Sequence, residues 1–216
     1  MANSSFSTWA SRRETKFPLL KLVSMTRALF VGVIKEVILP PAEVIEAQVR
    51  FGYEGVAEAY EYGAVVVVFQ RELQGDPDGL VRLGAWDTET QAWGYAYYPL
   101  DEPMSQNGGW VGLSDIAYYG DAKFLILERD NQGGPDASIK KIYMVDLNEH
   151  DSEFGTLTKS LVFDLLDTLA SATNGPVVEK VEGITIDADG NVWINNDNDG
   201  VDDNSGEQLL LNLGKP

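Results

Sequence analysis

The stretch LSDIAYYGDAKFLILERD, from Leu113 to Asp130, contains two runs of β-branched, aromatic and other apolar residues on either side of a Gly-Asp turn. Runs of this length and composition with turn residues between them are typical of a β-hairpin. Two further stretches have the same form: YEGVAEAYEYGAVVVVFQRE begins at Tyr53, and VEGITIDADGNVWINNDND begins at Val181. The sequence therefore predicts three similar hairpins.

The three hairpins belong to an internal repeat. An acidic or polar pair falls in the same register near the start of each hairpin: Glu54-Gly55, Ser114-Asp115 and Glu182-Gly183. Two more strand-like runs follow the first hairpin (LVRLGAWD and WGYAYYPL) and two follow the second (KIYMVDL and SLVFDL). Four antiparallel strands in a unit that is repeated around an axis are the layout of a β-propeller blade.

The predicted fold is therefore all-β: an incomplete β-propeller with two full four-stranded blades and partial blades. The third unit ends after its third strand, at Leu213, and residues 28–39 have the pattern of the last strand of a preceding blade. Only Leu161–Ala172 could form a helix, and its first half could equally be a strand. Propellers close with roughly four to eight blades. We expect either a piece of a longer protein, which we favour, or self-association.

Composition excludes several classes of function. The 216 residues include 34 Asp and Glu against 16 Lys and Arg, a net charge of −18, and 44% are hydrophobic, enough for a core. An acidic surface repels phosphates of DNA and RNA, so no nucleic-acid partner is expected. The chain has no cysteine, which excludes disulfides and thiolate chemistry. The lone His150 lies in a polar stretch and is expected to be solvated.

The N-terminal residues 1–27 differ from the rest, because they hold five basic residues and only one acidic residue. This basic leader fits either a transit peptide or a disordered or mis-started terminus. The propeller domain is expected over residues 28–216. No stretch is apolar for long enough to predict a membrane span.

Six of these motifs together resemble the phytase-like family known for the esterase-like activity of phytase: YEGVAEA, GLSDIA, FLILERD, KKIYMVDL, VEGITID and NVWINNDND. The resemblance covers about residues 30–213 and implies the C-terminal part of a family member, so that the chain would be truncated at its N-terminus. It implies a β-propeller fold, phosphoric ester hydrolysis and calcium, because β-propeller phytases are calcium enzymes.

Three carboxylates occupy matching positions in the repeat: Glu54, Asp115 and Glu182. Propeller symmetry would bring them together around one axis, where divalent cations can bridge carboxylates that otherwise repel each other. They are our candidates for catalysis, and Glu54 and Glu182 also for metal binding. With no cysteine and one histidine, calcium or magnesium suits this donor set better than zinc. The alternative is a structural role, in which these residues cap strands or form hydrogen bonds between blades.

Basic residues near the strand ends supply candidates for substrate binding: Arg71, Arg129 and Lys140. A guanidinium beside a metal site can hold a phosphate with two hydrogen bonds. Salt bridges of Arg71 with Glu72 and of Arg129 with Asp130 are the alternative. Glu128, next to Arg129, is a further candidate metal ligand.

The stretch NNDNDGVDDNSG, from Asn195 to Gly206, places oxygen-bearing side chains at alternating positions before a glycine. The pattern is similar to a calcium-binding loop, with candidate ligands at Asn195, Asp197, Asp199 and Asp203. A solvated acidic loop is the alternative.

We expect Asp187–Gly190 to be a plain hairpin turn. Ser114 lacks the second glycine of a nucleophile elbow and is not expected to be a nucleophile.

Two functions remain open from the sequence. The first is a calcium-dependent hydrolase that acts on a phosphorylated small molecule through metal-activated water. The second is a non-catalytic propeller that binds a ligand or a protein, with exposed aromatic residues at 93–98 and at Trp110 as its surface. A degenerate fragment without a function of its own is a third interpretation.

Overall fold

The computed structural model describes residues 37–150, 155–173, 175–198 and 208–216. Within these ranges the protein consists of three antiparallel sheets, in which each strand pairs with its neighbour in sequence. The first sheet contains Tyr53–Ala59 (β1), Ala64–Phe69 (β2), Leu80–Asp87 (β3) and Ala92–Pro99 (β4).

The second sheet repeats this order with longer strands. It contains Val111–Gly120 (β5), Lys123–Asp130 (β6), Lys140–His150 (β7) and Leu157–Asp164 (β8). The third sheet has three strands: Val181–Ile186 (β9), Val192–Asn196 (β10) and Leu210–Gly214 (β11). The described helical segments are short: Ala42–Ala47 (α2), Tyr60–Tyr62 (η2), Gly134–Asp136 (η3) and Leu166–Thr173 (α3).

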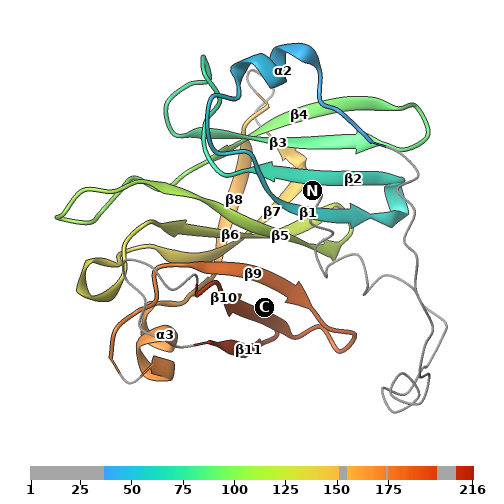
Figure 1. Cartoon of the computed structure of the whole chain (residues 1–216). Helices are drawn as coiled ribbons and strands as arrows, with labels where there is room; N and C mark the ends of the chain where they lie inside the picture. Colours follow the sequence, from blue (N-terminus) through green and yellow to red (C-terminus); the bar gives the residue numbers. More distant parts are fainter. Residues whose placement is uncertain (1–36, 151–154, 174, 199–207) are drawn as a thin grey trace, which may run out of the picture.

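The sheets lie one above another, with the second sheet between the other two (Figure 1). The first strand of each sheet provides the junction, because β1 packs beside β5 and β5 packs beside β9. The outer strands also meet, where the backbone of Tyr97 in β4 pairs with that of Thr156. No helix in the described ranges is long and apolar enough to cross a membrane.

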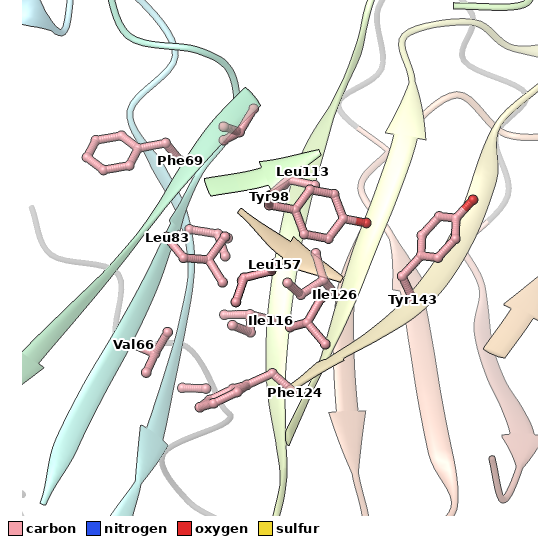
Figure 2. Packing of buried hydrophobic residues seen from close by; sticks show 14 of the residues in the cluster. Val66, Phe69, Leu83, Tyr98, Leu113, Ile116, Phe124, Ile126, Tyr143 and Leu157 are labelled. Carbon is pink, nitrogen blue, oxygen red and sulfur yellow. The ribbon is translucent and has the colours of Figure 1, made fainter. Parts of the chain in front are cut away.

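The second sheet is buried on both faces, which explains the uninterrupted apolar run in β6. Phe124 and Ile126 point into the core shared with the first sheet, where they join Val66 and Leu83 (Figure 2). Leu125 and Leu127 point the opposite way, into a second core shared with α3 and the third sheet. Successive residues of a strand alternate between its faces, so one apolar run supplies both cores.

Between the first two sheets lies an ionic cluster of Asp101, Glu128, Lys141 and Lys159. The Lys159 ammonium donates to Asp101 at 2.7 Å and to Glu128 at 2.8 Å, and Lys141 donates to Asp101 at 2.6 Å. Burial raises the pKa of Asp101, but hydrogen bonds from Lys141 and Lys159 outweigh it and hold the value at about 2. The cluster is therefore an ion-pair network that ties β6, β7 and β8 to the end of β4.

The predicted repeat is confirmed as three successive antiparallel sheets, the third with three strands. The all-β class is confirmed too, and Leu161–Ala172 divides into the end of β8 and most of α3. Residues 1–36 lie outside the described ranges, and so does most of the strand expected at 28–39. The prediction is wrong for its last residues, because 37–40 have no strand structure and lead into α2.

We expect Gly55→Ala to destabilise the protein by about 1–3 kcal/mol. A Cβ at residue 55 would lie 2.7 Å from the Ile116 nitrogen and 2.8 Å from the Asp115 Cα, so β1 would have to move away from β5. Gly94→Ala in β4 is the control, since a Cβ there meets no atom within 4 Å. Urea unfolding measures both variants, and equal losses would contradict the close approach of β1 to β5.

Lys159→Met should cost about 3–5 kcal/mol, because it leaves the buried Glu128 carboxylate without its cation. Adding Glu128→Gln should recover part of that loss. Lys123→Met removes an exposed ion pair of 3.9 Å and should change stability by less than about 1 kcal/mol. Chemical denaturation of the three variants tests the cluster. A Lys159→Met loss no larger than that of Lys123→Met would contradict its role.

Candidate functional site

The three carboxylates predicted to meet come from the three strands that form the sheet junction. Glu54 lies in β1, Asp115 in β5 and Glu182 in β9. The charges of Glu182 and Glu54 both act on Asp115, and the charge of Glu182 also acts on Glu54. The structure therefore brings all three within electrostatic reach of one another.

Asp115 is buried and binds backbone N–H groups with both carboxylate oxygens. Oδ1 accepts from its neighbour Ile116 at 2.8 Å, and Oδ2 accepts from Ile184 of β9 at 2.9 Å. Burial raises the pKa of Asp115 to about 7; the two N–H groups lower it, and the charges of Glu182 and Glu54 raise it. Asp115 thus forms the hydrogen bond between successive sheets that was the structural alternative for these positions.

Arg129 in β6 is the cation of this group, and only 4% of its side chain is exposed. Its Nη2 donates to the Glu182 carboxylate at 2.5 Å, and its Nε donates to the Ser114 hydroxyl at 3.0 Å. The predicted partner Asp130 contributes only its backbone oxygen, at 3.2 Å from Nη1. Arg129 therefore links β6 to β5 and β9.

Glu54 lies next to this pair. Residue Glu54 is exposed, but desolvation of its carboxylate by the surrounding protein and the charge of Glu182 raise its pKa to about 7, and Arg129 opposes them. A carboxylate that titrates near neutral pH can accept or release a proton under ordinary conditions. Of the three predicted carboxylates, Glu54 is the one for which no hydrogen bond to a described residue is found.

Two other predicted residues lie in different surroundings. Lys140 is fully buried and donates to the Asp130 backbone oxygen, to the Asp130 carboxylate and to the Gln132 backbone oxygen, at 2.6–2.8 Å. Burial lowers the pKa of Lys140 to about 8, although the charge of Asp130 and its hydrogen bond with Lys140 act to raise it. These bonds use all three N–H groups of the ammonium, so in this conformation none is left for a substrate phosphate.

Glu128 points to the opposite face of β6 from Arg129. Its carboxylate is fully buried and accepts hydrogen bonds from Tyr98 at 2.5 Å, from Lys159 at 2.8 Å and from the Asp101 backbone at 2.6 Å. The structure therefore does not bring this predicted metal ligand together with Glu54 and Glu182.

Only part of the predicted calcium loop lies in the described ranges. Asn195 and Asp197 are exposed, whereas Asp199 and Asp203 lie outside the described residues, so the loop stays a prediction.

The hairpin turn predicted at Asp187–Gly190 is confirmed, with Asp187 Oδ1 accepting from the backbone N–H groups of Asp189 and Asn191. Over the described ranges, no three acidic or histidine side chains form a ready-made metal site.

Arg71 lies just after β2, and its Nε donates to Glu72 at 2.9 Å, the salt bridge that was its predicted alternative. Its guanidinium also lies over the Trp110 ring, at 5.4 Å from the centroid. Residue spacing could not reveal this contact, because Trp110 precedes β5 and belongs to another repeat. Residue spacing could not reveal the ion pairs of Asp101 and Lys159 either, because their partners are distant in sequence.

Two residues that the sequence did not assign to the site are located as well. Ser114 is buried and His150 is exposed.

Comparison with known proteins gives one match. A family model described as "Phytase-like: Esterase-like activity of phytase" matches residues 22–200, which is most of the chain. Neither the curated proteins nor the solved structures contain a match.

The raised pKa of Glu54 predicts a pH-dependent effect of Glu54→Gln. An acid whose pKa is raised from 4.5 to about 7 on folding holds its proton more tightly in the folded state, so stability falls as pH rises between these values. Glu54→Gln removes the part of this loss of stability that the ionisation of Glu54 causes. The variant should melt above wild type at neutral to alkaline pH and close to it in acid.

Melting temperatures measured in EDTA across this pH range test the prediction, with Glu58→Gln as the control for loss of a charge in the same strand. A Glu54→Gln curve parallel to that of wild type would contradict it.

Proposed function

The chain belongs to the phytase-like family, and we propose that it is a calcium-dependent hydrolase of phosphoric esters built on blades of a β-propeller. Three sheets with strands in sequential order, joined through their first strands, support the propeller, because blades meet in this way around a central axis.

The observation that carries the proposal is the meeting of Glu54, Asp115 and Glu182 beside Arg129. Three acids, one from each sheet, and one cation leave an excess of negative charge where the first strands meet, and desolvation and the charge of Glu182 raise the pKa of Glu54 to about 7. Such an arrangement of perturbed groups is typical of functional sites.

The donor chemistry of these residues fits calcium, which binds six to eight oxygen atoms. Glu54 and Glu182 would hold the ion, while Asp115 fixes β9, the strand of Glu182, against β5 through its hydrogen bond from Ile184. Two carboxylates supply only part of the coordination, so water and substrate oxygens would complete it. When bound, calcium polarises a phosphoryl oxygen and lowers the pKa of a coordinated water.

The remaining steps belong to the side chains. Arg129, buried and held by Ser114 and Glu182, would stabilise the negative charge that develops on the phosphoryl group through its own charge. Glu54 would orient the attacking water beside the ion by a hydrogen bond; its raised pKa of about 7 belongs to the metal-free site, because a bound cation favours the ionised carboxylate. Arg71 binds a phosphate oxygen.

A second function is a non-catalytic module that binds an anionic ligand at the same place. It is favoured by the hydrogen bonds that engage both oxygens of Asp115, and by the ion pair that engages Glu182. These partners would hold the carboxylates as structural elements, and Arg71, the more exposed of the two arginines, would bind the ligand without turnover.

The two functions differ in phosphate release. We expect the protein to release phosphate from p-nitrophenyl phosphate or phytate in calcium and not in EDTA. Glu54→Gln and Glu182→Gln should lower the rate in calcium by about 100-fold or more. Glu58→Gln, a charge-matched change in the same strand, should leave the rate near that of wild type. Absence of calcium-dependent release from the folded protein would contradict the hydrolase and leave the binding module.

A further inference from the structure

One face of the first sheet carries a group of aromatic side chains that stay partly exposed. Successive residues of a strand alternate between the two faces of a sheet, and Leu83 of β3 and Ala96 of β4 point into the core shared with the second sheet. The opposite face takes the residues that alternate with them. Four rings gather there, and we call them the aromatic strip: Tyr53, Trp86, Trp93 and Tyr95. Two of them, Tyr53 and Tyr95, are 40% and 36% exposed.

The rings of the strip are held in fixed positions. The Trp93 ring lies nearly parallel to those of Tyr53 and Tyr95, at 11° and 13°, with centroids 6.5 Å and 5.9 Å away. Its Nε1 donates to the backbone oxygen of Leu39 at 3.0 Å. Gly84 lets the rings lie against the sheet, because a Cβ there would be 3.0 Å from the Trp93 ring and 3.1 Å from that of Tyr95. Binding of a partner would therefore cost these side chains little entropy.

The segment before β1 adds exposed apolar side chains to this surface. The helix α2 lies beside β4 (Figure 1), and the charge of its Glu43 acts on Tyr95. Leu39, whose backbone binds Trp93, is 66% exposed, and Ile45 of α2 is 47% exposed. Exposed apolar side chains that gather in this way mark a surface that contacts another molecule.

We propose that the aromatic strip is the interface of a symmetric dimer, in which the first sheets of two copies of this chain pack face to face. A two-fold axis would relate the copies, so that each presents the same surface to the other. The proposal is independent of the proposed function, because the strip lies on the face of the first sheet that points away from the second sheet, whereas Glu54, Asp115 and Glu182 lie where the sheets join.

The charge of the chain favours a second copy at this surface. Two copies that each carry a net charge of −18 repel each other wherever their acidic residues meet. At the strip this repulsion is small, because β2, β3 and β4 contain one acidic residue, Asp87, and Arg82 on the same face is paired with Asp76 at 2.5 Å. The flanking elements carry Glu43 in α2 and Glu58 in β1, which are exposed and would lie in the solvated rim of the interface.

The other end of the stack of sheets favours a two-fold dimer over a head-to-tail chain. Head-to-tail contact would place the strip against the outer face of the third sheet. There Ile184 and Ile194 point into the core, so the outer face takes Thr185, Trp193 and Asn195. A face with two polar residues around one ring complements the strip poorly. A second strip complements it well, because aromatic rings pack on one another in offset or edge-to-face arrangements.

Sedimentation equilibrium of the full chain tests the proposal. We expect a reversible equilibrium between monomer and dimer with no larger species. Tyr95→Glu, which places a charge in each strip, should raise the dimer dissociation constant roughly 30-fold or more, whereas Tyr95→Phe should retain the dimer. Leu39→Glu is a second disruptive change, at a side chain too exposed to be needed for folding. Tyr119→Glu is the matched control, since Tyr119 is 43% exposed but lies in β5 of the second sheet.

Two further measurements test the symmetry and the charge argument. Thr185→Glu, on the outer face of the third sheet, should leave a two-fold dimer unchanged and would disrupt a head-to-tail contact. Because the two copies carry like charge, raising the NaCl concentration from about 0.05 M to about 0.5 M should lower the dissociation constant by about 3- to 10-fold.

A wild-type chain that stays monomeric even at millimolar concentration would overturn the proposal, and would mean that another part of the chain or a different protein covers the strip. Loss of the dimer in Thr185→Glu or Tyr119→Glu to the same extent as in Tyr95→Glu would overturn it too, and so would a dimer that weakens as salt is added. Melting curves identify variants that fail to fold, and Leu39→Glu then decides.

Discussion

One buried carboxylate joins the three sheets. Asp115 sits in β5 against the backbone of Gly55 in β1, and its Oδ2 accepts the Ile184 N–H of β9. An unpaired N–H at a buried strand junction would cost about 1–3 kcal/mol, and a side chain larger than glycine at residue 55 would force β1 away. The position of Glu54 relative to Glu182, and so the whole charged site, depends on this contact.

The sequence predicts the repeat because each unit buries a similar pattern of strands. It also predicts that Glu54, Asp115 and Glu182 meet, because equal register places them at equivalent points of successive sheets. It does not predict which way Glu128 and Lys140 point. Both lie at strand ends like Arg129, but Glu128 faces the other side of β6, and Lys140 closes on the Asp130 loop. Such partners arise from packing between elements, which no local pattern encodes.

The charges of this acidic chain are divided between two kinds of environment. In the cluster of Asp101, Glu128, Lys141 and Lys159, acids and bases are equal in number and fully paired, which suits a structural contact between sheets. Around Glu54 three acids share one paired cation, Arg129. In the first arrangement the charges balance one another, so it needs no bound ion. The second has surplus negative charge and is stabilised by binding a cation or a proton. Only the second is therefore suited to metal binding or catalysis.

The most direct test of the account is a carbon-13 NMR titration of the side-chain carboxyl of Glu54 in EDTA, in wild type and in Glu182→Gln. The account predicts a midpoint near 7 in wild type and a lower one in the variant, because removing the charge of Glu182 favours the ionised form of Glu54. An ordinary midpoint in wild type, unaffected by Glu182→Gln, would mean that the strands do not bring these carboxylates together.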